Sequence, residues 1–160
     1  MKDIISIERI KQLHPKAREV FTKFIEECEN TFNITLRIML PVYRSIAEQN
    51  ALYAQGRTSP GKIVTNAKGG SSFHNYGLAV DLCRVDAEDS DKDGDTKEIL
   101  WEFDNGKLDP ITKKYNLEWG GNWHTIKDKP HFQLTFGKTW QQLFKMVTDK
   151  QVDAEGYVKL

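Results

Sequence analysis

Two short stretches of the sequence carry side chains that could bind a metal ion. The first reads SFHNYGLAVD and contains His74 and Asp81, and the second reads DKPHF and contains Asp128 and His131. Two imidazoles and a carboxylate suit catalytic zinc, which also keeps an open position for water or substrate. We therefore predict one zinc ion held by His74, Asp81 and His131. Asp128 is a spare carboxylate close to the last histidine, where it could act as a base.

Each of these residues has an ordinary explanation when it is taken alone. A single histidine is more often a hydrogen-bonded residue than a ligand, and a lone aspartate at a strand end is usually a turn residue. His14 and His124 have no partner at a recognisable spacing, so we expect neither to bind metal. The metal hypothesis rests on the combination of residue types in the two stretches.

Strand periodicity predicts how two of the ligands are presented. In the predicted strand 77–83, the apolar residues alternate with Asp81, which therefore lies on the opposite face. Gly77 and Ala79 keep that face thin and leave room for a cation. In the predicted strand 131–136, His131 alternates in the same way with a core set. That core set is Phe132, Leu134 and Phe136.

The remaining patterns predict one α+β domain, residues 1–160, in which helices pack on a small, mostly antiparallel sheet. One short helix is expected to begin at Ser6, and further helices are expected at 17–28, 45–56, 109–115 and 139–147. Strands are expected at 34–40, 77–83, 117–119 and 131–136. Ser45 and Glu48 form a capping box at the start of the third helix. Cys28 and Cys83 are expected to be free, partly buried thiols.

Composition and charge limit the classes of partner. The chain has 160 residues and a formal net charge of zero, so neither a nucleic-acid partner nor insertion into a membrane is expected. The N-terminus shows no signal-peptide pattern, and no segment approaches transmembrane length. We therefore expect synthesis in the cytoplasm.

An acidic segment leaves two hypotheses open. Asp89, Asp91 and Asp93, followed by Gly94, match the start of a calcium-binding loop. Position 12 of that loop is Leu100, where an EF-hand needs a bidentate glutamate. The segment is either a solvated acidic turn or a calcium site of altered geometry.

The two opening stretches resemble those of a known family of zinc peptidases. S-x-H-x-x-G-x-A-x-D followed by D-x-x-H is similar to the D,D-carboxypeptidases and L-alanyl-D-glutamate peptidases of the hedgehog/DD-peptidase fold, including phage endolysins. Two further stretches support the resemblance, YRSIAEQNALYAQGR and EWGGNW, so that it covers about residues 34–136.

The resemblance implies roles for several residues. His74, Asp81 and His131 would bind zinc, and Asp128 would be the general base. Arg44 matches an arginine that steadies the substrate carbonyl. Ser72 and Gln49 match positions near the substrate.

The resemblance also implies a function. We expect a monomeric peptidoglycan hydrolase that cuts the L-Ala–D-Glu bond of the stem peptide, with no separate wall-binding domain, and that reaches the wall through a holin or another export route. The alternatives are a D,D- or L,D-carboxypeptidase or dipeptidase with the same zinc site, or a non-catalytic zinc-containing binding module.

Overall fold

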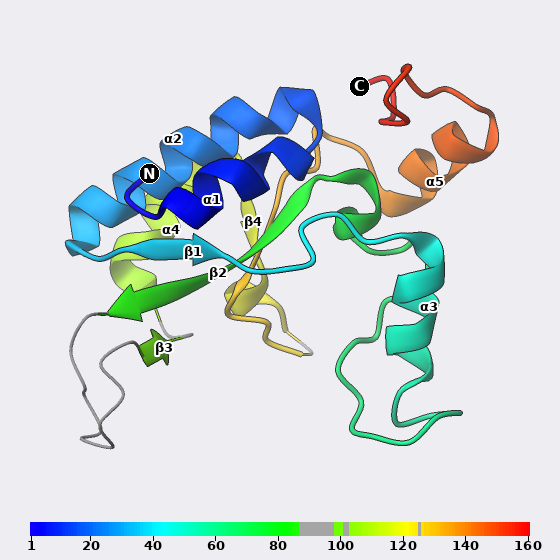
Figure 1. The fold of residues 1–160 in the computed structure, drawn as a ribbon, viewed down its shortest axis with the longest axis horizontal. Helices are drawn as coiled ribbons and strands as arrows, with labels where there is room; N and C mark the ends of the chain where they lie inside the picture. Colours follow the sequence, from blue (N-terminus) through cyan, green and yellow to red (C-terminus); the bar gives the residue numbers. More distant parts are fainter. Residues whose placement is uncertain (87–97, 101–102, 125) are drawn as a thin grey trace.

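The computed structural model describes residues 1–86, 98–100, 103–124 and 126–160. Within these residues an antiparallel sheet of five short strands runs through the middle of the molecule (Figure 1). The strands are β1 (Leu36–Ile38), β2 (Ala79–Asp86), β3 (Glu98–Leu100), β4 (Glu118–Trp119) and β5 (His131–Gln133). Their order is β1-β2-β5-β4, and β3 pairs with β2. The longest strand, β2, thus joins the two halves of the sheet.

Helices cover the sheet and extend it at one end. The α-helices are α1 (Ile4–Arg9), α2 (Pro15–Phe32), α3 (Ile46–Ala54), α4 (Asn105–Lys114) and α5 (Trp140–Thr148), and the 3-10 turns are η1 (Ile10–Gln12), η2 (Phe73–Tyr76) and η3 (Gly120–Asn122). In Figure 1, α1 and α2 lie together over β1 and β2, whereas α3 and the loop after it project away from them. The predicted α+β class, with a small antiparallel sheet, is confirmed.

The core lies between α2 and the sheet. Phe21, Phe24 and Ile25 of α2 are fully buried, as the helical period predicts. The ring centroid of Phe24 lies 5.1 Å from that of Phe132 in β5. The core residues expected from the predicted strand 77–83 are also fully buried; they are Leu78, Val80 and Leu82. Their burial agrees with the predicted core face, although Ala79 and Cys83 on the other face are buried as well.

The core assignment of Phe136 is wrong. β5 ends at Gln133, and the chain then turns, with a hydrogen bond from the Lys138 amide to the Thr135 carbonyl. Phe136 has a φ of 50° and its residue is 39% exposed. The turn breaks the alternation on which the assignment depended.

The start of the first helix also differs from the expectation. α1 begins after Asp3, whose carboxylate accepts from the Ser6 backbone amide at 3.1 Å and from the Ser6 hydroxyl at 2.7 Å. Ser6 is buried, and its hydroxyl accepts from the Ile38 amide of β1 at 2.8 Å. Ser6 therefore joins the helix to the sheet instead of capping it. Asp3 also pairs with Arg37 of β1 at 3.0 Å.

The fourth helix is longer than expected. Asp104 caps α4 by accepting from the Gly106 amide at 3.0 Å, so the helix starts at Asn105. Pro110, which was expected to open the helix, lies inside it. The predicted capping box of Ser45 and Glu48 at α3 is confirmed.

Both cysteines are free and buried, which confirms the thiol prediction. Burial raises the pKa of Cys28 to about 12 and that of Cys83 to about 11, so both thiols stay protonated near neutral pH. None of the helices among the described residues has the length and apolar character needed to cross a membrane. The candidate calcium ligands Asp89, Asp91 and Asp93 lie outside the described residues.

Replacing Asp3 should test how α1 is anchored to the sheet. Burial raises the pKa of Asp3, but hydrogen bonds from Arg37 and Ser6 outweigh it and hold the pKa below its usual value. We expect Asp3→Ala to lower the free energy of unfolding by about 1–3 kcal/mol at neutral pH, measured by urea denaturation. Because the folded pKa is lowered, the charge contribution is present above about pH 4 and is lost as the pH falls further.

The matched control is Glu8→Ala on the exposed side of the same helix, where the change should stay within about 0.5 kcal/mol. Equal losses for the two variants, or a difference that does not change with pH, would contradict this account of Asp3.

Candidate metal centre

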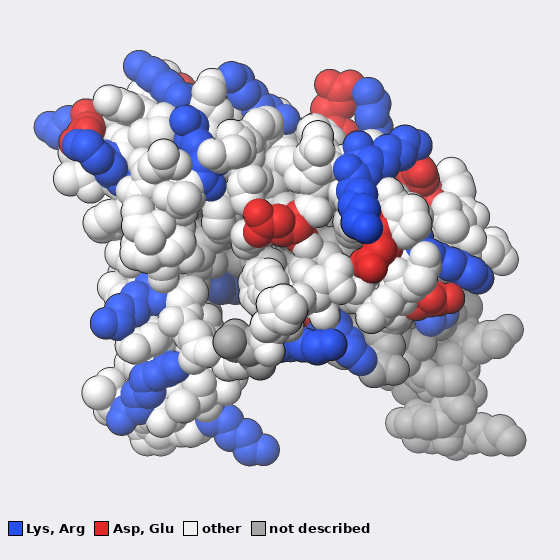
Figure 2. All heavy atoms as spheres, turned by 180° about the vertical axis from the view of Figure 1, so that it is seen from behind, with Lys and Arg blue, Asp and Glu red and all other residues white. Residues whose placement is uncertain are grey.

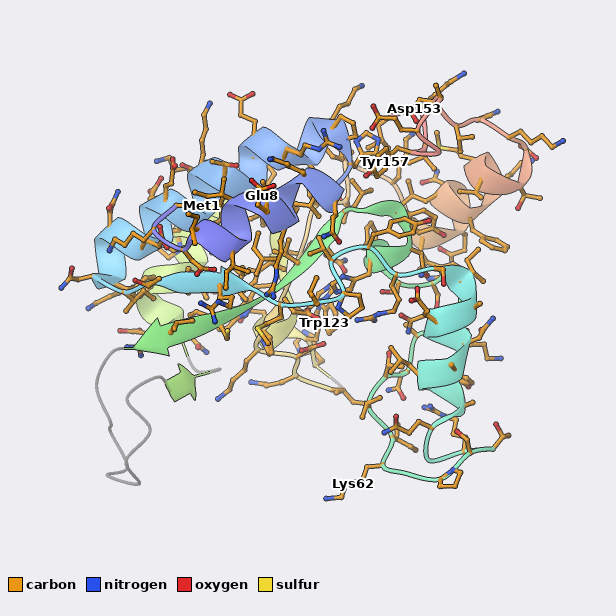
Figure 3. All side chains as sticks on the ribbon, in the orientation of Figure 1. Met1, Glu8, Lys62, Trp123, Asp153 and Tyr157 are labelled. Atoms are coloured by element: carbon orange, nitrogen blue, oxygen red, sulfur yellow. The ribbon has the colours of Figure 1, made fainter. Side chains whose placement is uncertain are left out.

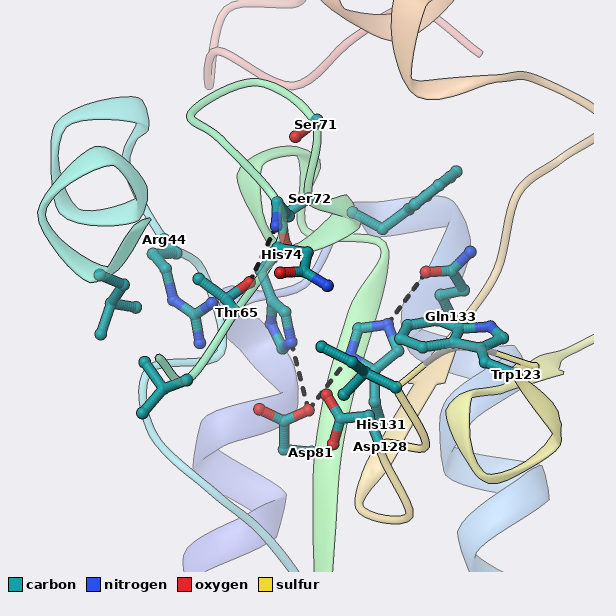
Figure 4. Close-up of a pocket in the computed structure, with 16 residues that line it drawn as sticks. Arg44, Thr65, Ser71, Ser72, His74, Asp81, Trp123, Asp128, His131 and Gln133 are labelled. Atoms are coloured by element: carbon teal, nitrogen blue, oxygen red, sulfur yellow. Dashed lines mark hydrogen bonds and ion pairs between the residues drawn. The ribbon is translucent and has the colours of Figure 1, made fainter. Parts of the chain in front are cut away.

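The three predicted ligands meet at one point of the structure. His74 lies in η2, and Asp81 and His131 are directly opposite each other on β2 and β5. The Oδ1 atom of Asp81 is 3.3 Å from Nε2 of His74 and 3.2 Å from Nδ1 of His131. One atom from each residue can be chosen so that all three lie within 4.8 Å of one another. Figure 4 shows the two imidazoles converging on the carboxylate.

These distances fit a zinc site. Zinc bonds of about 2.0–2.1 Å in a tetrahedral arrangement place neighbouring ligand atoms about 3.3 Å apart. A hydrogen bond between an imidazolium and a carboxylate is shorter, at about 2.7–2.9 Å. The observed 3.2 and 3.3 Å match the spacing of ligand atoms around a shared cation. The Asp81 side chain is 28% exposed, so one side of the cluster is open.

Each imidazole is held through its other ring nitrogen. Nδ1 of His74 lies 3.0 Å from the carbonyl oxygen of Val42. Nε2 of His131 lies 2.9 Å from Oε1 of Gln133. A hydrogen bond at the far nitrogen sets which nitrogen of a histidine is free to bind metal. These contacts leave Nε2 of His74 and Nδ1 of His131 facing Asp81.

The charges within the cluster stabilise each other. Burial raises the pKa of Asp81, but hydrogen bonds and charge from His131 and His74 hold it well below its usual range. Burial lowers the pKa of His131, and its hydrogen bond and charge interaction with Asp81 outweigh burial and raise it. Asp81 is thus kept as the carboxylate that a cation needs.

Gly77 has a different role from the one expected. It lies before β2, at the end of η2, with a φ of 66° that favours glycine. A Cβ atom there would lie 2.7 Å from the backbone nitrogen of His14, whose amide donates to the Gly77 carbonyl at 2.9 Å. Gly77 therefore allows the turn that carries His74 to pack against the chain before α2.

The segment before α3 is fastened to the same turn. The Arg44 amide donates to the His74 carbonyl at 3.1 Å, and the Asn75 side chain donates to the Arg44 carbonyl at 2.6 Å. Oδ1 of Asn75 accepts from the Gly70 amide at 2.9 Å. The buried Asn75 side chain thus joins the Arg44 segment to the loop after α3. Sequence reasoning did not single out Asn75.

Arg44 points its guanidinium into a cleft beside the cluster, as Figure 4 shows. One terminal nitrogen donates to Oε1 of Gln49 at 2.8 Å. Its Nε atom is buried and has no hydrogen-bond partner among the described residues. A buried guanidinium nitrogen without a partner carries a desolvation cost.

Ser72 and Gln49, both predicted near the substrate, are placed differently. Ser72 lines the cleft. Gln49 is fully buried, and its amide donates to the Ala67 carbonyl at 2.7 Å while accepting from Arg44. Gln49 does not line the cleft itself but contacts residues that do, Arg44 and Ala67.

Asp128 also lines the cleft, on the turn that leads into β5. Its amide donates to the Gly120 carbonyl at 3.0 Å, and its carbonyl accepts from the His131 amide at 3.1 Å. Burial, together with the charge of Asp81, raises the pKa of Asp128, although His131, His74 and Arg44 oppose the shift. A carboxyl with a raised pKa is suited to exchanging protons near neutral pH.

The cleft has a volume of about 480 Å³ and mixed walls. Arg44, His74, Asp81, Asp128 and His131 form its polar floor, and apolar side chains form part of its rim. The apolar members include Leu52, Val64, Trp123 and Ile126. Figure 3 shows Trp123 near the middle of the molecule and Lys62 at the far tip of the loop after α3.

Of the other two histidines, His14 has structural contacts. His14 is buried, its Nε2 lies 2.8 Å from the Val158 carbonyl, and its Nδ1 accepts from the Lys16 amide. His124 is outside the ligand cluster. On the face seen in Figure 2, Lys and Arg side chains are scattered among Asp and Glu and form no continuous patch.

A substitution at Gly120 should displace the Asp128 turn. A Cβ atom at this position would lie 2.5 Å from the Asp128 carbonyl oxygen and 3.2 Å from Cβ of His131. We expect Gly120→Ala to weaken zinc binding at least about tenfold by moving His131, measured by titration against a competing chelator. The matched control is Gly106→Ala in α4, where the nearest atom is 3.4 Å away. Equal zinc affinity in the two variants would show that the turn tolerates the added methyl group.

Three comparisons bear on this geometry. Residues 65–134 match the family described as D-alanyl-D-alanine carboxypeptidase. The peptidoglycan L-alanyl-D-glutamate endopeptidase CwlK of Bacillus subtilis (strain 168) is 44% identical over 102 residues, which cover 58% of this chain and 56% of that protein. The chain thus spans about half the length of the curated relative that it matches.

A solved structure extends the likeness to the fold. The Serratia marcescens L-Ala D-Glu endopeptidase ChiX superposes with a TM-score of 0.54 at 25% identity, covering 83% of this chain and 88% of that one. The segment matched by the family contains His74, Asp81, Asp128 and His131. The resemblance to the D,D-carboxypeptidase and L-alanyl-D-glutamate peptidase family, predicted from the two motifs, is therefore confirmed in sequence and in fold.

Proposed function

We propose that this chain is a zinc peptidase that hydrolyses the L-Ala–D-Glu bond of peptidoglycan stem peptides. The observation that carries the proposal is the spacing of the three ligand atoms, at 3.2 and 3.3 Å around Oδ1 of Asp81, beside a cleft that also contains Asp128. The names of CwlK and ChiX support the choice of bond.

In this proposal His74, Asp81 and His131 hold the zinc ion. Bound zinc supplies Lewis acidity, which makes water more acidic and polarises a carbonyl group. The residues fit this ion because two neutral imidazoles and one carboxylate leave a net positive site with room for one further ligand.

Asp128 is the general base and then the general acid. Its carboxylate takes a proton from the attacking water and afterwards gives that proton to the leaving amine nitrogen. The raised pKa of Asp128 suits both transfers, because it makes the carboxylate a stronger base toward water and lets the protonated form persist closer to neutral pH.

Arg44 steadies the carbonyl oxygen on which negative charge develops. Its guanidinium lines the cleft and presents charged N–H donors there. Gln49 acts through Arg44 by fixing the guanidinium at 2.8 Å, and Ser72 contacts the substrate from the cleft wall.

Two rivals share the same site. A D,D- or L,D-carboxypeptidase would use identical chemistry, and the matched family carries the name D-alanyl-D-alanine carboxypeptidase. A non-catalytic module with structural zinc is less well supported, because a closed structural site needs no carboxyl of raised pKa beside it.

Substituting Asp81 and substituting Asp128 should affect zinc content and turnover differently. Asp81→Ala removes a ligand, so the purified protein should lose zinc. Asp128→Ala keeps all three ligands, so it should retain zinc and lose about 10²- to 10⁴-fold in rate. Metal analysis beside turnover measurements checks both. A zinc-free Asp128→Ala protein together with a zinc-loaded, active Asp81→Ala protein would reverse the assigned roles.

The bond that is cut can be identified with purified wall fragments. Digestion followed by mass spectrometry should reveal new D-Glu amino ends and new L-Ala carboxyl ends. Released D-Ala would instead support the carboxypeptidase. No cleavage of any fragment by zinc-loaded protein would support the binding module.

A further inference from the structure

A chain of hydrogen bonds runs from the candidate metal centre to the outer strand of the sheet. Nε2 of His131 lies 2.9 Å from Oε1 of Gln133, and Nε2 of Gln133 donates to Oε2 of Glu118 at 2.8 Å. The sheet register sets this chain, because Glu118 on β4 is directly opposite Gln133 on β5. Ala79 of β2 is opposite Gln133 on the other side.

Donors and acceptors can be assigned along these hydrogen bonds in only one consistent way. An ionised glutamate accepts hydrogen bonds and has no proton to donate, so the NH₂ group of Gln133 must point toward Glu118. Its carbonyl oxygen then points toward His131. A carbonyl oxygen can only accept, so Nε2 of His131 must carry the proton. With zinc bound the ring is neutral, and its lone pair is then on Nδ1, the nitrogen that lies 3.2 Å from Oδ1 of Asp81.

We propose that Gln133 and Glu118 are positioning residues that select the ring nitrogen His131 presents to the metal. The inference rests on the proposed zinc site and extends it beyond the three ligands. Gln133 sets the tautomer of His131, and Glu118 sets the orientation of Gln133.

The two ligand histidines differ in a way that explains why Glu118 is needed. Nδ1 of His74 is held by the backbone carbonyl of Val42, which cannot exchange acceptor for donor. The acceptor for His131 is a side-chain amide, which can turn over and present its NH₂ group with almost no change in shape. A turned amide would favour the His131 tautomer that carries its proton on Nδ1. A protonated Nδ1 has no lone pair with which to bind zinc. The Glu118 carboxylate removes that alternative.

Burial of His131 and Gln133 makes the correct assignment of donors and acceptors important for stability. His131 is 5% exposed and Gln133 is 8% exposed, so water cannot readily replace a lost partner. The Trp123 ring lies 5.1 Å from the His131 ring. Glu118 is on the exposed side, where a carboxylate is readily solvated. Gln133 also lines the cleft, so contact with substrate is the competing role that the test must separate.

Three variants test the inference. Gln133→Leu removes the acceptor and should weaken zinc binding about 10- to 100-fold, the usual effect of losing a partner of a metal-bound histidine. Glu118→Gln leaves the amide free to turn and should cause a smaller loss. In the double variant that combines Glu118→Gln with Gln133→Glu, the new amide donates to the new carboxylate, which again accepts from Nε2 of His131. This exchange should recover most of the affinity.

The measurements are zinc titration against a competing chelator and ¹⁵N NMR of the imidazole nitrogens in zinc-loaded protein. The wild-type chain should show His131 with zinc on Nδ1 and a proton on Nε2. Gln151→Leu, at an exposed glutamine, is the control for the same chemical change and should keep wild-type affinity. Melting curves of the zinc-free proteins show whether each variant folds. If Gln133→Leu fails to fold, Glu118→Gln and the exchange variant still test whether Gln133 and Glu118 position His131.

The outcomes separate this inference from the proposed function. The inference would be overturned if Gln133→Leu kept wild-type zinc affinity and the same zinc-bound nitrogen of His131, even if its KM for the peptide substrate changed. It would also be overturned if the exchange variant recovered none of the lost zinc affinity. A wild-type chain that binds no zinc would instead overturn the proposed function.

Discussion

The register between β2 and β5 is the constraint on which the candidate site depends. It places Asp81 directly opposite His131, so that a carboxylate and an imidazole share one face of the sheet. A buried carboxylate is costly unless positive charge compensates for it. Here two imidazoles lie 3.2 and 3.3 Å from the carboxylate, and a cation held by all three groups would supply the positive charge. A shift of one residue would turn one of the two ligands to the opposite face.

The elements around this pair hold the remaining groups in place. The η2 turn carries His74, and Asn75 of the same turn holds the segment that contains Arg44. On the other side, the close approach of Gly120 to Asp128 fixes the turn before His131. Hydrogen bonds and close packing therefore position the ligands, the base and the arginine relative to one sheet. Such preorganisation favours chemistry in which charge develops at a fixed point.

Sequence reasoning selected the three candidate ligands that the structure brings together, because residue type and strand alternation are short-range patterns. Residue type and the period of two were sufficient for Asp81 and His131. It missed Asn75, Gly120 and Glu118, whose roles depend on partners distant in the sequence. Alternation did place Gln133 on the face of His131, but nothing in the sequence showed that Glu118 would be opposite it. The core assignment of Phe136 failed because β5 ends three residues earlier.

The central claim is that His74, Asp81 and His131 bind one zinc ion through three specified atoms. The most direct measurement is an anomalous difference map of zinc-soaked crystals, collected on both sides of the zinc absorption edge. The account predicts one strong peak within about 2.0–2.2 Å of Nε2 of His74, an oxygen of Asp81 and Nδ1 of His131, with a fourth position open to the cleft. A peak elsewhere, or a peak bound through Nε2 of His131, would contradict it.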